Sequence, residues 1–179
     1  IADKYIVINP AEARQYADKG LVLSQQMKWE KGIAVFHSII ATIFSDAGQY
    51  DSAIHYNQVA LNIHTAAKDS FNIASTLNNM GVVNQRQSDY VAALAQYTEL
   101  LKIAEARNDS NLIALAYGNI SGVYNIQKDY KKALDYSLRA LNISQQTKDV
   151  DAIAEASVNV ASIHISVPDS TNAAQFLNK

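Results

Sequence analysis

Apolar residues along this chain recur in steps of three and four, which is the spacing of one face of an α-helix. The stretch from Ile73 to Asn84 has this pattern, and so does the stretch from Tyr90 to Leu101. The alternation of apolar and polar positions that is typical of a half-buried strand is missing from both stretches. We therefore expect an all-α fold built from helices of roughly 15 to 18 residues.

The helical pattern repeats with a period of 40 residues. Matching isoleucine, tyrosine and alanine positions recur at this spacing, and they are Ile33, Ile73, Ile113 and Ile153; Tyr50, Tyr90 and Tyr130; and Ala53, Ala93, Ala133 and Ala173. The period divides one continuous domain into residues 1–29 (with the second helix of a preceding repeat), repeats 30–69, 70–109 and 110–149, and a partial repeat 150–179. Such a period predicts stacked repeats, with alanine where two helices approach closely.

Short polar breaks separate the helical stretches. Two of these breaks are Gln87-Ser88-Asp89 and Gln127-Lys128-Asp129, and the Asp that ends each can cap the following helix. Pro168-Asp169-Ser170 takes this place in the last unit, where the proline ends the preceding helix. Turns of about two to four residues predict antiparallel helix pairs.

The order of small and bulky residues on these helix pairs resembles the tetratricopeptide repeat. The matching residues are Met80-Gly81, Asp89-Tyr90, Ala93-Leu94, Leu100-Leu101 and Ile103 in one unit, and Ile120-Ser121, Asp129-Tyr130, Ala133-Leu134, Tyr136, Ala140-Leu141 and Ile143 in the next. The family glycine before Asp-Tyr is kept only as Gly48. The resemblance covers residues from about 10 to 179 and implies a right-handed superhelical solenoid, lined on its inner wall by the first helix of each pair.

A period of 40 residues is similar to the longer variety of this repeat. That variety is found in bacterial peptide-responsive regulators, in the input regions of some sensor kinases and in eukaryotic cargo adaptors. The resemblance therefore implies the input or ligand-binding region of a signalling protein.

The implied inner wall carries one asparagine per repeat at a single register position, namely Asn79, Asn119 and Asn159. In the longer variety this Asn often holds the main chain of a ligand, because an amide both donates and accepts hydrogen bonds. The alternative is structural, with the amide bonded to the neighbouring repeat. The other residues that the register places on this wall are Ser75, Gln85, Arg86, Asn125 and Ser162.

Arg86 has two interpretations. A guanidinium on the wall can bind a ligand carboxylate, whereas a lone Arg is otherwise a solvated surface charge. The several convergent Lys and Arg of the family's carboxylate clamp do not occur here. We therefore expect an amide-rich, nearly neutral wall and no strongly acidic partner.

Composition and charge exclude several other functions. The net charge is −2 with acids and bases interspersed, so we expect no binding of nucleic acid and no direct membrane insertion by this segment. The chain has no cysteine and its four histidines lack metal-site spacing, which predicts neither a metal nor a cofactor. Because nucleophile elbows, phosphate loops and dinucleotide fingerprints are also missing, we expect no catalytic residues.

These observations predict a non-catalytic module that binds a protein or peptide, extended or helical, in the concave groove. We interpret it as a fragment of a larger signalling or scaffold protein. The alternative is a self-associating scaffold, a homodimer formed through apolar end faces that carry Leu21 and Leu23 or Phe176 and Leu177. The compartment is left open between the cytoplasm and, for the sensor region of a membrane kinase, the periplasm.

Overall fold

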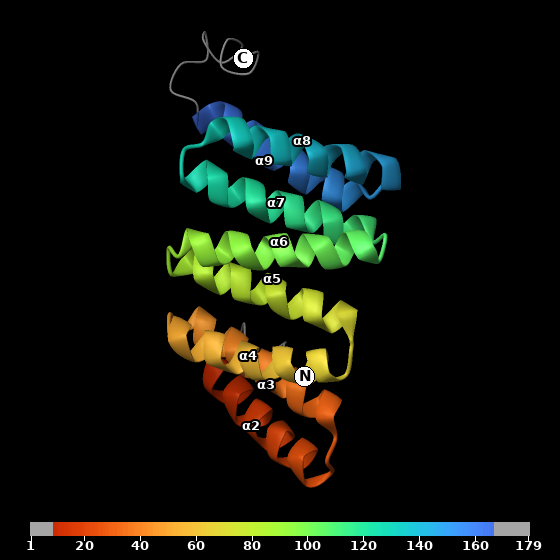
Figure 1. Cartoon of the computed structure of the whole chain (residues 1–179). Helices are drawn as coiled ribbons and strands as arrows, with labels where there is room; N and C mark the ends of the chain where they lie inside the picture. Colours follow the sequence, from red (N-terminus) through yellow and green to blue (C-terminus); the bar gives the residue numbers. More distant parts are fainter. Residues whose placement is uncertain (1–8, 167–179) are drawn as a thin grey trace. The chain divides into compact units, whose positions relative to one another are not determined.

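The computed structural model describes residues 9–166, which contain eight α-helices and no strand (Figure 1). They are α2 (Pro10–Gln26), α3 (Glu30–Asp46), α4 (Tyr50–Ala66), α5 (Ser70–Arg86), α6 (Tyr90–Ala106), α7 (Ser110–Ile126), α8 (Tyr130–Thr147) and α9 (Val150–Ser166). The predicted all-α class is thus confirmed. The hand of the implied superhelix stays a prediction, and the expectations for the 168–170 turn, Ala173, Phe176 and Leu177 lie outside the described residues.

The chain divides into two compact units, and the division falls inside α6 between Gln96 and Tyr97. We call them the N-terminal unit, which includes α2 to α5, and the C-terminal unit, which includes α7 to α9. Consecutive helices pack against one another within each unit, and the first helices of successive pairs also touch, α3 against α5 and α7 against α9. These contacts agree with the predicted helix pairs, while the division into repeats remains an interpretation of the period.

Every turn between helices has a residue in the left-handed conformation, and these residues are spaced 20 apart along the chain. Glycine occupies this position once, at Gly48 with φ of 72°. The six other left-handed residues are Lys28, Lys68, Ser88, Asn108, Lys128 and Lys148. In each turn the next residue donates its backbone N–H back into the ended helix, as Asp89 does to Asn84 O at 2.9 Å. The chain direction therefore reverses within three residues.

The residue that completes one turn also starts the following helix. Asp89 Oδ1 accepts the backbone N–H of Ala92 at 3.0 Å, and Asp129 Oδ1 accepts that of Lys132 at 3.2 Å. Asp69, Asp109 and Asp149 cap α5, α7 and α9 in the same way. The predicted capping is confirmed, and in these five turns one residue satisfies backbone groups of two helices, whereas Trp29 and Gln49 make no side-chain cap.

The N-terminal unit has an alanine-rich contact between its first two helices. Ala13 and Ala17 of α2 are fully buried against Ile40 and Ile43 of α3. Because alanine allows close approach, the bulkier residues lie beside this contact. They include Phe44, whose ring lies 4.7 Å below the guanidinium carbon of Arg14. The result is a core of small residues with an aromatic and cationic margin.

The C-terminal unit combines apolar packing with a buried hydroxyl pair. Ala133 and Leu134 of α8 pack against Ile163 of α9. Beside them, Ser121 Oγ lies 2.6 Å from Ser137 Oγ and donates to the carbonyl of Ala133 at 2.7 Å. Each of these hydrogen bonds contributes about 1 kcal/mol net, so both hydroxyls can be buried between α7 and α8 without an orphaned donor.

We predict that Gly48→Ala lowers the free energy of unfolding by about 1 kcal/mol, because an L-residue is strained at positive φ. A Cβ on Gly48 would meet no atom within 4 Å, so this loss measures backbone conformation alone. The matched variant Lys68→Gly relieves the same strain one turn later and should raise the free energy of unfolding. Urea unfolding of both variants checks this, and equal effects of the two would contradict it.

Asp129 provides a test of the caps by pH. Its pKa is lowered in the folded chain, first by the hydrogen bond from the Lys132 side chain and further by the Lys132 backbone N–H and by charge, against an opposing effect of burial. The carboxylate therefore stabilises the fold above its unfolded pKa of about 4, and this contribution is lost as pH falls through the lower folded pKa.

We expect Asp129→Ala to lower the free energy of unfolding by about 1 kcal/mol at neutral pH. The gap between this variant and the wild type should shrink below about pH 4. Asp129→Asn, which keeps a capping oxygen without a charge, is the control and should lose less. A gap for the alanine variant that stays constant in urea unfolding from neutral to acidic pH would refute the role of the charge.

Candidate functional site

The predicted asparagine row lies on first helices, with Asn79 on α5, Asn119 on α7 and Asn159 on α9. All three side chains are half-buried. Asn79 borders a cavity of the N-terminal unit and Asn159 borders a cavity of the C-terminal unit. In each unit, the row position therefore lies at the seam between two successive first helices.

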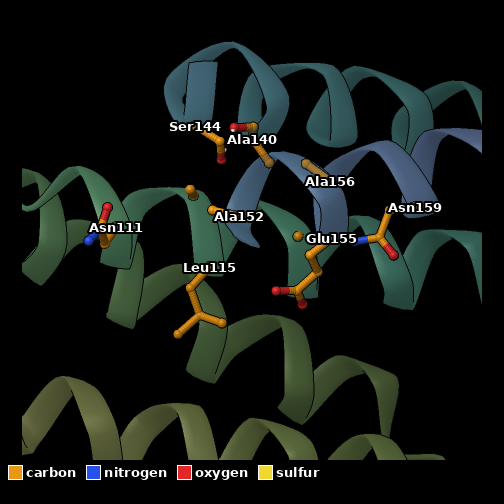
Figure 2. A pocket seen from close by; sticks show the side chains of 10 residues that line it. Asn111, Leu115, Ala140, Ser144, Ala152, Glu155, Ala156 and Asn159 are labelled. Atoms are coloured by element: carbon orange, nitrogen blue, oxygen red, sulfur yellow. Dashed lines mark hydrogen bonds between the residues drawn. The ribbon is translucent and has the colours of Figure 1, made fainter. Parts of the chain in front are cut away.

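The C-terminal cavity lies between α7, α8 and α9 and has a volume of about 80 Å³. Ala140 and Ser144 of α8 line it from one side, and Leu115 of α7 and Glu155 and Asn159 of α9 surround it from the others (Figure 2). Ser144 Oγ donates to Ala140 O at 3.0 Å and is therefore already satisfied. Because four alanines and Leu115 contribute to its lining, this cavity suits a small apolar group that is flanked by an amide.

Asn159 is also close to the neighbouring first helix. A Cβ on Gly118 of α7 would lie 3.8 Å from Asn159 Nδ2. The absence of a side chain at Gly118 thus leaves the Asn159 amide next to backbone of the preceding repeat, at the rim of the cavity. This geometry is compatible both with ligand contact and with the structural alternative, so the role of the row stays a prediction.

Arg86 is a surface charge, as one interpretation expected, but it is paired instead of alone. Its Nη1 lies 2.8 Å from Asp46 Oδ1 and donates to Ser45 Oγ at 3.0 Å, which joins α5 to α3. The two charged side chains are 46% and 47% exposed, so the pair contributes at most about 1 kcal/mol. Its more important effect is geometric, because it holds the guanidinium at the rim of the N-terminal cavity that Asn79 also lines.

The other predicted wall residues are dispersed. Ser75 of α5 and Ser162 of α9 are exposed, and Gln85 of α5 is half-buried. Asn125 of α7 is half-buried too, and within residues 9–166 its Oδ1 has no hydrogen-bond partner although that atom is buried. Of the eight predicted residues, only Asn79 and Arg86 line the same cavity among those described here.

Three residues at these cavities were missed by sequence reasoning. Asp46 was overlooked because its partner Arg86 is 40 residues away, and Glu155 because it belongs to none of the sequence motifs. Asn57, on a second helix, lines the N-terminal cavity and is buried. The signal that could have found it is its register, since the next repeat has a buried tyrosine, Tyr97, at this position.

Among the described residues, burial shifts the pKa of several side chains. Burial is the main cause that lowers the pKa of His37 and of His64, because it disfavours the charged imidazolium. Burial also raises the pKa of Tyr97 to about 12. Across residues 9–166 no group of three or more His, Asp or Glu could hold a metal ion, and no helix there is long and apolar enough to cross a membrane.

The two leucines of the predicted N-terminal end face differ in exposure. Leu23 of α2 is 57% exposed, whereas Leu21 is partly buried and packs against the core of the N-terminal unit. Leu21 therefore does not belong to an open apolar face. Self-association through end faces remains a prediction.

The sequence comparison identifies the repeat. Residues 32–106 match the model of the tetratricopeptide repeat family, which confirms the predicted family over that stretch. No match to the sequence was found among curated proteins.

Solved structures match over nearly the whole chain. Aspartyl phosphate phosphatase F from Bacillus subtilis superposes with a TM-score of 0.84 at 24% identity, over 99% of this chain and 46% of that one. A signal transduction ATPase from Pyrococcus horikoshii with a tetratricopeptide repeat sensor gives 0.82 at 20% identity, over 98% and 28%. A Rap protein complexed with competence and sporulation factor gives 0.75 at 16% identity, over 99% and 60%. At these identities the likeness shows the fold, and the chain spans less than two thirds of each of these proteins.

Proposed function

We propose that this chain is a non-catalytic repeat module of a signalling protein, and that it binds a polypeptide on the surface formed by its first helices. The observation that carries this proposal is that the asparagine row borders a cavity in both units, although the other lining positions of the two cavities are not equivalent in the repeat. At the seam between successive first helices lies a small cavity, lined by an amide of the asparagine row at Asn79 and at Asn159. A polypeptide suits such a surface, because its main chain presents amide groups at regular intervals with side chains between them.

The chemistry of the row suits a main chain. A side-chain amide can accept the N–H and donate to the carbonyl of one peptide unit, irrespective of the side chain that the unit carries. Each such bond contributes about 0.5 to 1.5 kcal/mol net. Useful affinity therefore requires several bonds together with apolar contacts in the cavities.

The comparisons support a signalling role by analogy. One similar structure is a Rap protein in complex with competence and sporulation factor, and another has a tetratricopeptide repeat sensor. In both, the similar fold occurs within a longer protein, which fits a recognition module that is coupled to an output elsewhere. That the module itself is not an enzyme stays a prediction.

The asparagine row is tested by substitution. A peptide is first selected on the chain from a phage-displayed library of random sequences, and its affinity is then measured by fluorescence anisotropy. We expect Asn79→Ala and Asn159→Ala each to weaken binding about five-fold, equivalent to about 1 kcal/mol for a lost hydrogen bond. Asn119→Ala should act in the same direction.

Asn142→Ala is the matched control, because Asn142 is exposed on the second helix α8 and should leave affinity unchanged. Circular dichroism confirms that each variant is folded. If the three row variants bind the selected peptide as tightly as the control variant does, the row has no part in binding.

A further inference from the structure

The N-terminal cavity differs from the C-terminal one in the polarity of its lining. It lies between α3, α4 and α5 and has a volume of about 100 Å³. Its polar lining comes from Thr42, Ser45, Asp46, Asn57, Asn79 and Arg86. We call this cavity the amide niche. Since Asp46 and Arg86 are half-exposed while Asn57 is 1% exposed, the niche leads from the surface inward to a buried amide.

Asn57 is the unusual residue of the niche. Across residues 9–166, no donor lies within hydrogen-bond distance of its buried Oδ1. A buried amide oxygen without a partner is uncommon in folded proteins, because burial removes the water that would otherwise bond to it. Asn57 Oδ1 is thus a buried acceptor that a hydrogen-bond donor of a ligand would satisfy.

The repeat register explains why space exists beside Asn57. One period later the equivalent residue is the fully buried Tyr97, and two periods later it is Ser137, whose hydroxyl contacts Ser121 Oγ at 2.6 Å. Asn57 faces no such hydroxyl, because the residue equivalent to Ser121 is Ala41, another lining residue of the niche. At this position, therefore, the first repeat has neither a ring that fills the space nor a hydroxyl that satisfies the polar group.

The charges at the rim select a neutral group. Arg86 and Asp46 form an ion pair at 2.8 Å, so their charges compensate each other. A guanidinium has five N–H donors, of which the Nη1 group serves Asp46 and Ser45. A ligand carboxylate would be repelled by Asp46 and by the acceptor oxygen of Asn57, and a ligand ammonium would be repelled by Arg86. A primary carboxamide avoids both conflicts, because it donates through its NH₂ and accepts through its carbonyl.

We propose that the amide niche binds the side-chain carboxamide of an Asn or Gln in the polypeptide partner, with its NH₂ donating to Asn57 Oδ1 and its carbonyl facing Arg86. This inference rests on the proposed function and specifies one side chain of the partner. An incoming carboxamide NH₂ gives Asn57 Oδ1 the hydrogen bond that it lacks within residues 9–166, and a buried acceptor that gains a partner favours the bound state.

The niche is tested first with propionamide, which is a Gln side chain without its backbone. Backbone amide signals of Thr42 and Val83, which line the niche, are followed by ¹H–¹⁵N NMR during titration. We expect a saturable shift with propionamide and none with propionate or propylammonium at equal concentration. The absence of a saturable shift with propionamide, or an equal response to all three probes, would overturn the proposal.

Variants then locate the effect. Asn57→Leu keeps the branching and the number of heavy atoms of the side chain and removes the acceptor, so propionamide should bind at least about five-fold more weakly. Arg86→Gln, at the exposed rim, leaves Asn57 in place and should also weaken binding, which keeps the test decisive if the first variant does not fold. Asn142→Leu on α8 is the matched control with unchanged binding. Unchanged propionamide affinity in a folded Asn57→Leu or in Arg86→Gln would sink the assignment.

Peptide selection separates this proposal from the one on which it rests. Peptides selected from the random library should be enriched in Asn or Gln at one position, and selection on Asn57→Leu should lose that enrichment. If the selected peptides bind without this enrichment in Asn or Gln, carboxamide binding in the niche is refuted, whereas the proposed binding of a polypeptide is not. Binding of propionamide with no peptide selected would support the niche and count against the proposed function.

Discussion

The structure depends on a turn that reverses the chain within three residues and recurs every 20 residues. Its centre is a residue in the left-handed conformation, after which the next residue bonds back to the finished helix and starts the following one. At five turns that next residue is an aspartate whose carboxylate accepts a backbone N–H of the new helix. Because the turns recur at this interval, Asn79, Asn119 and Asn159 all lie on first helices at the same position of the 40-residue period.

The cavities follow from where this regular packing is imperfect. Helices approach closely at alanine, so Ala53, Ala93 and Ala133 are fully buried. Asn57 has the position that Tyr97 fills in the next repeat, whereas the smaller residues Ala17 and Ser137 have it in the other repeats. The amide oxygen of Asn57, unpaired within residues 9–166, therefore distinguishes this repeat more than a change of volume does. The features that make the chain a candidate for binding are therefore local departures from the pattern that folds it.

The sequence predicts the helices well because their signals are local and periodic. Tyr50, Tyr90 and Tyr130 were expected to begin helical stretches, and α4, α6 and α8 begin at these residues. The left-handed turn residues were not predicted, since six of the seven lack the glycine that would mark them. A lysine or serine at such a position is held there by the hydrogen bonds of the turn, and composition does not reveal this.

The sites are less predictable, because they depend on distances across the fold. The ion pair of Arg86 with Asp46 requires side chains from two helices that the sequence separates by 40 residues. The unsatisfied oxygen of Asn57 is a property of its surroundings, and an asparagine on a second helix gives no sign of it. The asparagine row could be identified from its register, but whether its amides face a ligand or a neighbouring repeat depends on atomic detail of each seam.

The central claim is that a polypeptide partner binds on the first helices. Amide hydrogen exchange of the chain, with and without a peptide selected from the random library, tests it most directly. The account predicts slower exchange that is greatest along α5 and α9 and their neighbours α3 and α7, and smaller in α4 and α8, which contribute fewer lining residues to the two cavities. Protection by the peptide that is confined to α4 or α8 would contradict the account.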